Sequence, residues 1–74
     1  MATEVIATRS HVRETELAAR RLLIRAAHLE KRAQRPRTDA GERASLTAQA
    51  GELRRDARAL LAEISELSRR ASAA

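Results

Sequence analysis

The sequence predicts an all-α fold: an antiparallel hairpin of two long helices, of the helical coiled-coil type, that dimerises into a four-helix bundle. In the second half of the chain, leucine recurs every seventh residue at Leu46, Leu53, Leu60 and Leu67, and alanine or isoleucine recurs between them. With heptad positions written a to g, leucine occupies d and mostly alanine occupies a, and a helix buries such a stripe against another helix. The first half carries a stripe of the same spacing, and the chain's one proline lies between the two.

The first helix is expected at about residues 4–34. Its a and d positions run with heptad spacing from Val5 to Ala33 and include Val12, Leu22 and Leu29. Pro36 stops this helix, because the residue before a proline is pushed out of the α region. We therefore expect the turn at residues 35–39.

The second helix is expected at about residues 40–72. Asp39, with Glu42 three residues later, resembles a capping box that opens a helix. Gly51 lies inside this helix at position b, away from the stripe, and a glycine there costs about 1 kcal/mol relative to alanine. Residues 1–74 thus form a single helical-hairpin domain in this interpretation.

Self-association is expected because a hairpin of this size buries only one stripe per helix. The gain from that burial must exceed an ordering cost of about 1.5 kcal/mol per residue. Leu23 and Leu61 both lie at position e beside the stripe, where they widen the apolar face toward a second hairpin. Alternating alanine and leucine layers resemble Rop-type four-helix bundles, and this resemblance implies that two hairpins dimerise. The expected core and dimer residues are Leu22, Leu23, Leu29, Leu46, Leu53, Leu60, Leu61, Ile64 and Leu67.

The composition argues against an enzyme, and we expect no catalytic residue, no cofactor and no metal. The chain has no cysteine, which excludes a disulfide and a thiolate metal site. His11 and His28 lie too far apart to share a helical turn, and no glycine-rich phosphate loop or Ser–His–Asp arrangement is readable. No apolar run approaches the roughly 20 residues of a membrane span, and no secretory signal opens the chain. We therefore expect a cytoplasmic protein without a membrane partner. Arginine makes up 14 of the 15 basic residues, which suggests a bacterial or phage genome rich in GC.

A line of apolar residues on the first helix is a candidate surface for a partner protein. Ile6, Leu17 and Ile24 cluster nearly opposite the main stripe. An apolar strip with a basic border fits an acidic amphipathic helix. The leading hypothesis is therefore a protein–protein interaction module that acts as an adaptor, regulator or assembly factor. The expected partner-binding residues are Leu17, Ile24, Arg13, Arg20, Arg21 and Lys31.

A basic segment supports an alternative function, the binding of RNA or DNA through its phosphate backbone. Residues 17–37 hold seven basic side chains against Glu30 alone, a net charge of +6. Contacts of basic side chains with phosphates supply most of the non-specific affinity for nucleic acid. The chain has no aromatic side chain to stack an unpaired base, and the segment can equally be a solvated face. The residues of this alternative are Arg20, Arg21, Arg25, Arg32, Arg35 and Arg37.

Overall fold

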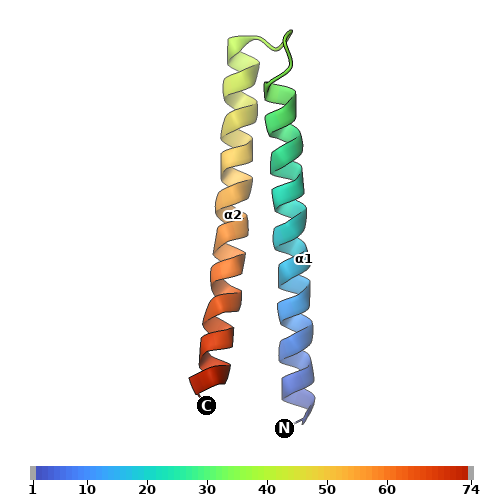
Figure 1. Ribbon diagram of the computed structural model, residues 1–74, viewed down its shortest axis with the longest axis vertical. Coiled ribbons are helices and arrows are strands. Elements are labelled where there is room, and N and C mark those ends of the chain that lie inside the picture. Colours follow the sequence, from blue (N-terminus) through green and yellow to red (C-terminus); the bar gives the residue numbers. More distant parts are fainter. Residues whose placement is uncertain (1, 74) are drawn as a thin grey trace.

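Two antiparallel helices joined by a short turn make up the fold (Figure 1). The computed structural model describes the backbone of residues 2–73 and the side chains of residues 8–72. Helix α1 spans Ala2–Ala33 and helix α2 spans Ala40–Ala73, so α1 begins two residues and ends one residue before the expected bounds. The Cα atoms extend over 57 × 17 × 11 Å, which makes the hairpin one helix thick. The predicted all-α hairpin is confirmed.

Side-chain hydrogen bonds fix the turn. The carboxylate Oδ1 of Asp39 accepts a hydrogen bond from the backbone N–H of Glu42 at 2.7 Å, so Asp39 caps the start of α2. The guanidinium Nε of Arg43 donates to the carbonyl of Ala33 at 2.9 Å, and Thr38 Oγ1 donates to the carbonyl of Arg32 at 3.0 Å. These bonds satisfy carbonyls at the end of α1 that no longer have a partner within the helix.

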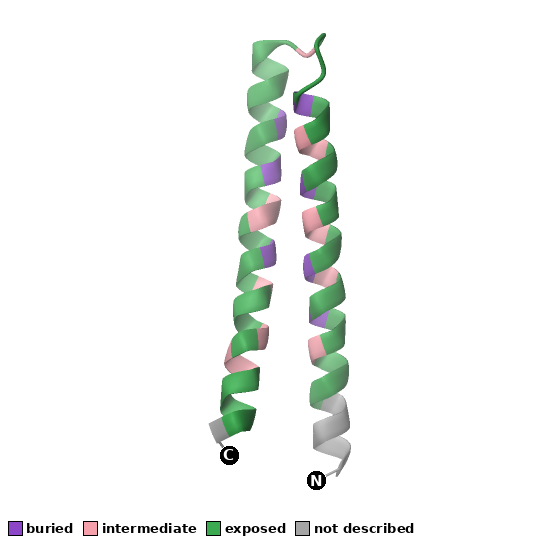
Figure 2. Cartoon of the chain, viewed as in Figure 1, coloured by how far each residue is buried: buried purple, intermediate pink, exposed green. Residues whose placement is uncertain are grey.

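The seam between the helices is centred on alanine. Ala26 and Ala57 are fully buried at 0% exposure, and the other alanines at position a between residues 19 and 50 are nearly so (Figure 2). At position d, Leu46 is 6% exposed, whereas Leu22, Leu29, Leu53 and Leu60 are only half-buried. No large side chain among those described is fully buried. The helices therefore meet mainly on their smallest residues, and the d-position leucines other than Leu46 lie at the margin of the seam.

The hairpin opens toward its termini. Figure 1 shows α1 and α2 close together near the turn and farther apart at the opposite end. Position a holds alanine along most of the seam, but it holds Val12 in α1 and Ile64 in α2 toward the open end, and both are half-buried. Larger side chains at the position of closest approach keep the helix axes farther apart. The widening thus follows from the change in side-chain size along one heptad position.

The two edges of the seam differ in character. On the g edge, formed by the g positions of both helices, His11 Nε2 lies 3.4 Å from the Oε1 of Glu63. On the e edge, formed by the e positions, Glu30 and Arg54 form an ion pair. The hydrogen bond and charge of Glu30 raise the pKa of Arg54 above its ordinary value.

Replacing Gly51 with alanine is expected to raise the free energy of unfolding by about 1 kcal/mol. A Cβ atom at this position would meet no atom within 4 Å, so the hairpin itself gives glycine no packing role there. Urea unfolding followed by far-ultraviolet circular dichroism at one chain concentration measures the change. Ala48→Gly, at another exposed site of α2, is the matched control and should lose a similar amount. A loss of stability in Gly51→Ala would contradict the prediction, and would place a neighbouring chain against this backbone.

Candidate protein-interaction surface

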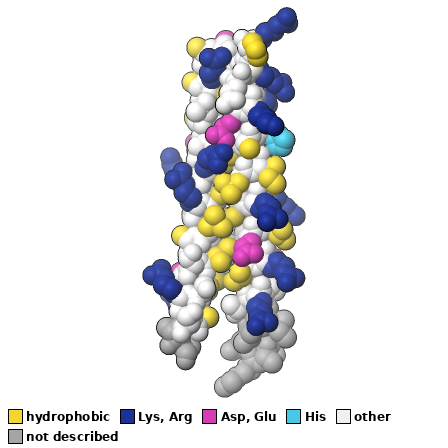
Figure 3. Space-filling view, viewed as in Figure 1, with side chains coloured by type: hydrophobic (Ala, Val, Ile, Leu, Met, Phe, Trp, Pro, Cys, Tyr) yellow, Lys and Arg dark blue, Asp and Glu magenta, His cyan; other side chains and the backbone are white. Residues whose placement is uncertain are grey.

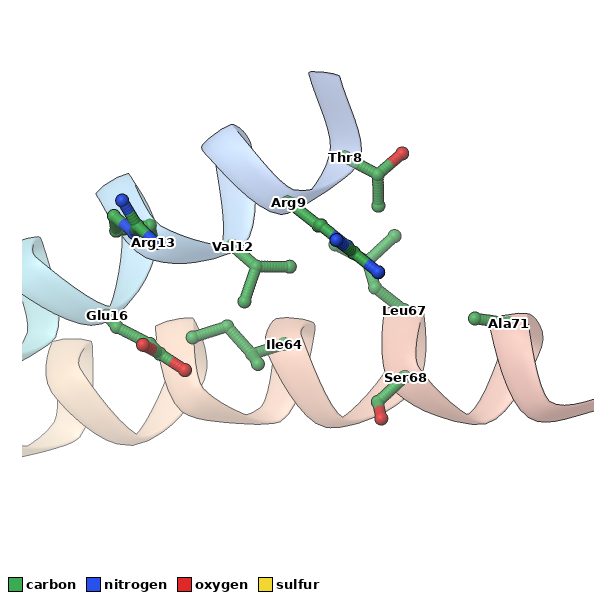
Figure 4. Close-up of a pocket in the computed structure, with 9 residues that line it drawn as sticks. All are labelled: Thr8, Arg9, Val12, Arg13, Glu16, Ile64, Leu67, Ser68 and Ala71. Atoms are coloured by element: carbon green, nitrogen blue, oxygen red, sulfur yellow. The ribbon is translucent and has the colours of Figure 1, made fainter. Parts of the chain in front are cut away.

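An apolar groove lies between the helices near the open end of the hairpin. It encloses about 440 Å³. Figure 4 shows the side chain of Val12 pointing from α1 toward α2, between Ile64 and Leu67. Three e-position residues line the groove, namely Arg9, Glu16 and Ser68, and no g-position residue does, which places it on the e edge. The remaining lining residues are Thr8, Arg13 and Ala71.

Two smaller hollows adjoin this groove through Glu16. One is lined by Leu23 and Leu61, with Ala19, Arg20 and Glu16 around them. The other lies on the outer side of α1 and is lined by Leu17, Arg13, Arg20 and Glu16. Because Glu16 lines all three, they form one continuous surface. We call it the e-edge surface and define its apolar part as Val12, Leu17, Leu23, Leu61, Ile64 and Leu67.

The e-edge surface presents apolar side chains to solvent inside a basic border. Leu17 is 45% exposed and Leu61 is 41% exposed. Figure 3 shows hydrophobic side chains gathered along the seam of both helices, with lysine and arginine side chains around them. Among the described side chains, Arg9, Arg13 and Arg20 line these hollows without forming an ion pair, and Glu16 is the one acidic residue beside them. The border therefore has a net charge of +2, which favours an acidic partner.

The structure brings together some of the residues that the sequence singles out for partner binding. Leu17, Arg13 and Arg20 surround one hollow. Ile24, at 52% exposure, lies two helical turns farther along the same line of α1, and Arg21 and Lys31 are also exposed on this helix. The side chain of Ile6 lies outside the described residues.

Sequence reasoning misses the groove itself and the part that Arg9 plays in its border. Heptad spacing assigns Val12, Ile64 and Leu67 to the stripe between the helices, with no sign that the seam opens around them. The available signal is the replacement of alanine by two β-branched residues at position a. That replacement predicts a wider seam near Val12 and Ile64.

The arginines of the basic segment are exposed but do not form one face. Arg35 and Arg37 lie in the turn. On α1, Arg25 is four residues after Arg21 and therefore beside it, and Arg32 continues the same side two turns later. Arg20 lies on the other side of the helix, at position b. None of these six side chains forms an ion pair within the described part of the chain, so all remain available to an anionic partner.

No metal site, membrane-spanning helix or related protein assigns a chemistry to the described part of the chain. Over the described residues, no group of three or more histidine, aspartate and glutamate side chains could hold a metal ion. Neither described helix combines the length and the apolar character that crossing a membrane requires. Comparison with protein-family models, curated proteins and solved structures finds no match to this chain. Any functional proposal therefore depends on the surface itself.

Proposed function

We propose that this chain is a small non-enzymatic protein-interaction module that acts as a homodimeric helical bundle. It binds a partner protein through the e-edge surface and the neighbouring line of Leu17 and Ile24. The observation that carries the proposal is the exposure of large apolar side chains beside arginines that have no ion-pair partner. An adaptor, a regulator or an assembly factor would use such a surface.

The partner chemistry that fits this surface is an acidic amphipathic helix. Its apolar face would enter the groove over Val12, Ile64 and Leu67, and its acidic flank would lie against Arg9, Arg13 and Arg20. Full burial of one leucine or isoleucine side chain contributes about 1.5–3 kcal/mol. Rim charges of this kind act mainly on the rate of association and on the choice of partner.

The surface area of the hairpin supports a homodimer. The chain exposes 6140 Å². A compact globular protein of 8.2 kDa exposes about 4,500 Å². The excess of about 1,600 Å² is larger than the roughly 800 Å² that each partner buries in a stable interface of standard size. Covering part of the hairpin with a second copy would bring its exposure into the ordinary range.

Replacing both Leu17 and Ile24 with aspartate is expected to weaken partner binding at least about a hundredfold, because each change removes a buried contact worth more than a factor of ten. Both residues are exposed, so helicity and dimer mass should stay unchanged. The immobilised chain is used to capture proteins from a nuclease-treated lysate, and the recovered partner is then titrated in purified form.

The matched control changes Ala48 and Ala62 to aspartate, since both are exposed on the outer face of α2 and the added charge is the same. The control should bind like the wild type. Equal binding by the Leu17 and Ile24 variant would contradict the assignment of this line to the partner.

Nucleic-acid binding is the second candidate, and the six exposed arginines without ion pairs favour it. The same capture experiment distinguishes the two when the nuclease is omitted. This candidate is supported if the bound material shows nucleobase absorbance and if the bound amount falls steeply as the salt concentration rises. A complex that resists salt and shows no nucleobase absorbance supports a protein partner.

A further inference from the structure

We infer that the second copy packs against the g edge, with the two-fold axis parallel to the helices, so that α1 of each copy contacts α2 of the other. This inference rests on the proposed homodimer and deepens it. It assigns the face of the contact, the symmetry, and the end of the bundle at which the two turns lie.

The half-buried leucines lie beside the g edge. Because alanine at position a occupies the centre of the seam, the d positions are displaced to one side of it and the e positions to the other. A residue three positions after a d residue lies at position g and is its neighbour on the helix surface. Each half-buried leucine at position d has a charged neighbour of this kind: Leu22 has Arg25, Leu29 has Arg32, Leu53 has Asp56, Leu60 has Glu63 and Leu67 has Arg70. The g edge thus offers Leu22, Leu29, Leu53 and Leu60 within a charged border, whereas on the e edge Leu23 and Leu61 adjoin the groove over Val12, Ile64 and Leu67.

The charges of the g edge are divided between the helices. The charged or titratable residues at the g positions of α1 are Glu4, His11, Arg25 and Arg32, and those of α2 are Glu42, Asp56, Glu63 and Arg70, so near the turn α1 is basic and α2 is acidic. Within one hairpin, His11 and Glu63 make contact. Among the described side chains, Arg70 pairs with Glu66, whereas Arg25, Arg32, Glu42 and Asp56 are exposed and form no ion pair.

The division of charge selects the symmetry. A two-fold axis parallel to the helices brings Arg25 and Arg32 of α1 against the edge of α2 that carries Glu42 and Asp56, at both contacts of the dimer. This axis also keeps segments at the same height along the bundle side by side. Within one hairpin, the hydrogen bond from Arg43 to the carbonyl of Ala33 places the start of α2 level with the end of α1. Arg32 of one copy therefore lies level with Glu42 of the other. The alternative axis, perpendicular to the helices, places α1 against α1 and α2 against α2. Asp56, near the middle of α2, would then meet its own copy, and Arg25 and Arg32 would lose their acidic neighbours on α2, which is unfavourable.

This arrangement leaves the e-edge surface free for the partner. Leu23 and Leu61, which the heptad pattern places beside the second hairpin, then belong to the partner-binding surface. A homodimer of this kind presents two such surfaces on opposite sides of the bundle, and both basic turns at one end.

A spin label in the turn tests the symmetry directly. The chain has no cysteine, so Arg37→Cys supplies a single attachment site on an exposed turn residue. With the axis parallel to the helices, the two labels lie at one end, and the distance between them is well below half of the 57 Å length of the hairpin. A distance close to that length would overturn the inference and leave the proposed homodimer standing. A monomeric wild-type chain at high concentration would overturn both.

A charge-swapped chain tests the contact edge independently. Arg25→Glu, Arg32→Glu, Glu42→Arg and Asp56→Arg are combined, and all four sites are exposed, so the helical hairpin is retained. We expect this chain to dimerise with itself at low ionic strength. The charge-swapped chain is then mixed with isotope-labelled wild type and examined by native mass spectrometry. The fraction of dimers with one chain of each kind should be at least tenfold below the fraction expected from random association. Random mixing would overturn the g edge as the contact, and a preference for mixed dimers would overturn the parallel axis.

Discussion

Replacing Ala57 with leucine is expected to lower the free energy of unfolding by about 3 kcal/mol, at the upper end of the usual cost of overpacking a close-packed core. Ala57 has 0% exposure and lies at the centre of the seam, where the helices meet on alanine. The additional carbon atoms can be accommodated only if α1 and α2 move apart. That movement would also separate the neighbouring layers around Ala19 and Ala50, which is why the expected cost is high.

Urea unfolding followed by circular dichroism measures the effect of Ala57→Leu at a fixed chain concentration. The matched control is Ala59→Leu, two residues away on the exposed side of α2, which should change stability by no more than about 0.5 kcal/mol. Equal stability of the two variants would show that the helices do not approach each other closely at Ala57.

Replacing Leu46 with alanine is expected to cost about 3 kcal/mol, because a buried leucine truncated to alanine loses its transfer free energy and leaves a cavity. At 6% exposure, Leu46 is the most deeply buried of the described leucines. It also lies near the turn, where the bond of Arg43 to the carbonyl of Ala33 holds the two helix ends together. Collapse of the neighbouring residues around the cavity is therefore restricted.

Leu61→Ala is the matched control for this change, because Leu61 is 41% exposed and loses less contact when it is truncated. Thermal unfolding of the two variants at equal concentration provides the comparison. A small effect at Leu46 would contradict its burial in the seam. An equally large effect at Leu61 would show that a second chain covers the e edge.

Heptad spacing, together with Pro36 and the capping pair Asp39 and Glu42, is sufficient to predict the two helices, the turn and the antiparallel arrangement. These features depend on residues close together in the chain, such as Asp39 with Glu42 or leucine with leucine seven residues later. The rotation of each helix about its own axis is less accessible, because it depends on how α1 and α2 fit together. The pattern treats a and d positions alike, yet Ala26 is fully buried and Leu53 only half-buried.

The candidate surface likewise has one part that the sequence of a single helix predicts and one part that depends on both helices. The exposed line of Leu17 and Ile24 can be predicted from one helix alone, since it follows from helical spacing. The groove around Val12 and Ile64 requires both helices and the distance between them, which no single-helix pattern contains. The bond of Arg43 to the end of α1 is equally hidden, because Arg43 occupies position a, where a buried side chain is expected.

The gradual opening of the seam gives the hairpin an uneven local stability. The half near the turn holds the buried alanines, Leu46 and the bonds of Arg43, so its amide hydrogens should exchange with solvent most slowly. Its contacts join residues close together in the chain, which favours rapid closure from the turn outward. The groove lies in the other half, which we expect to close last and open first. A ligand bound there would stabilise the least protected part of the hairpin. Ligand binding and the packing of α1 against α2 along their full length would therefore be thermodynamically linked.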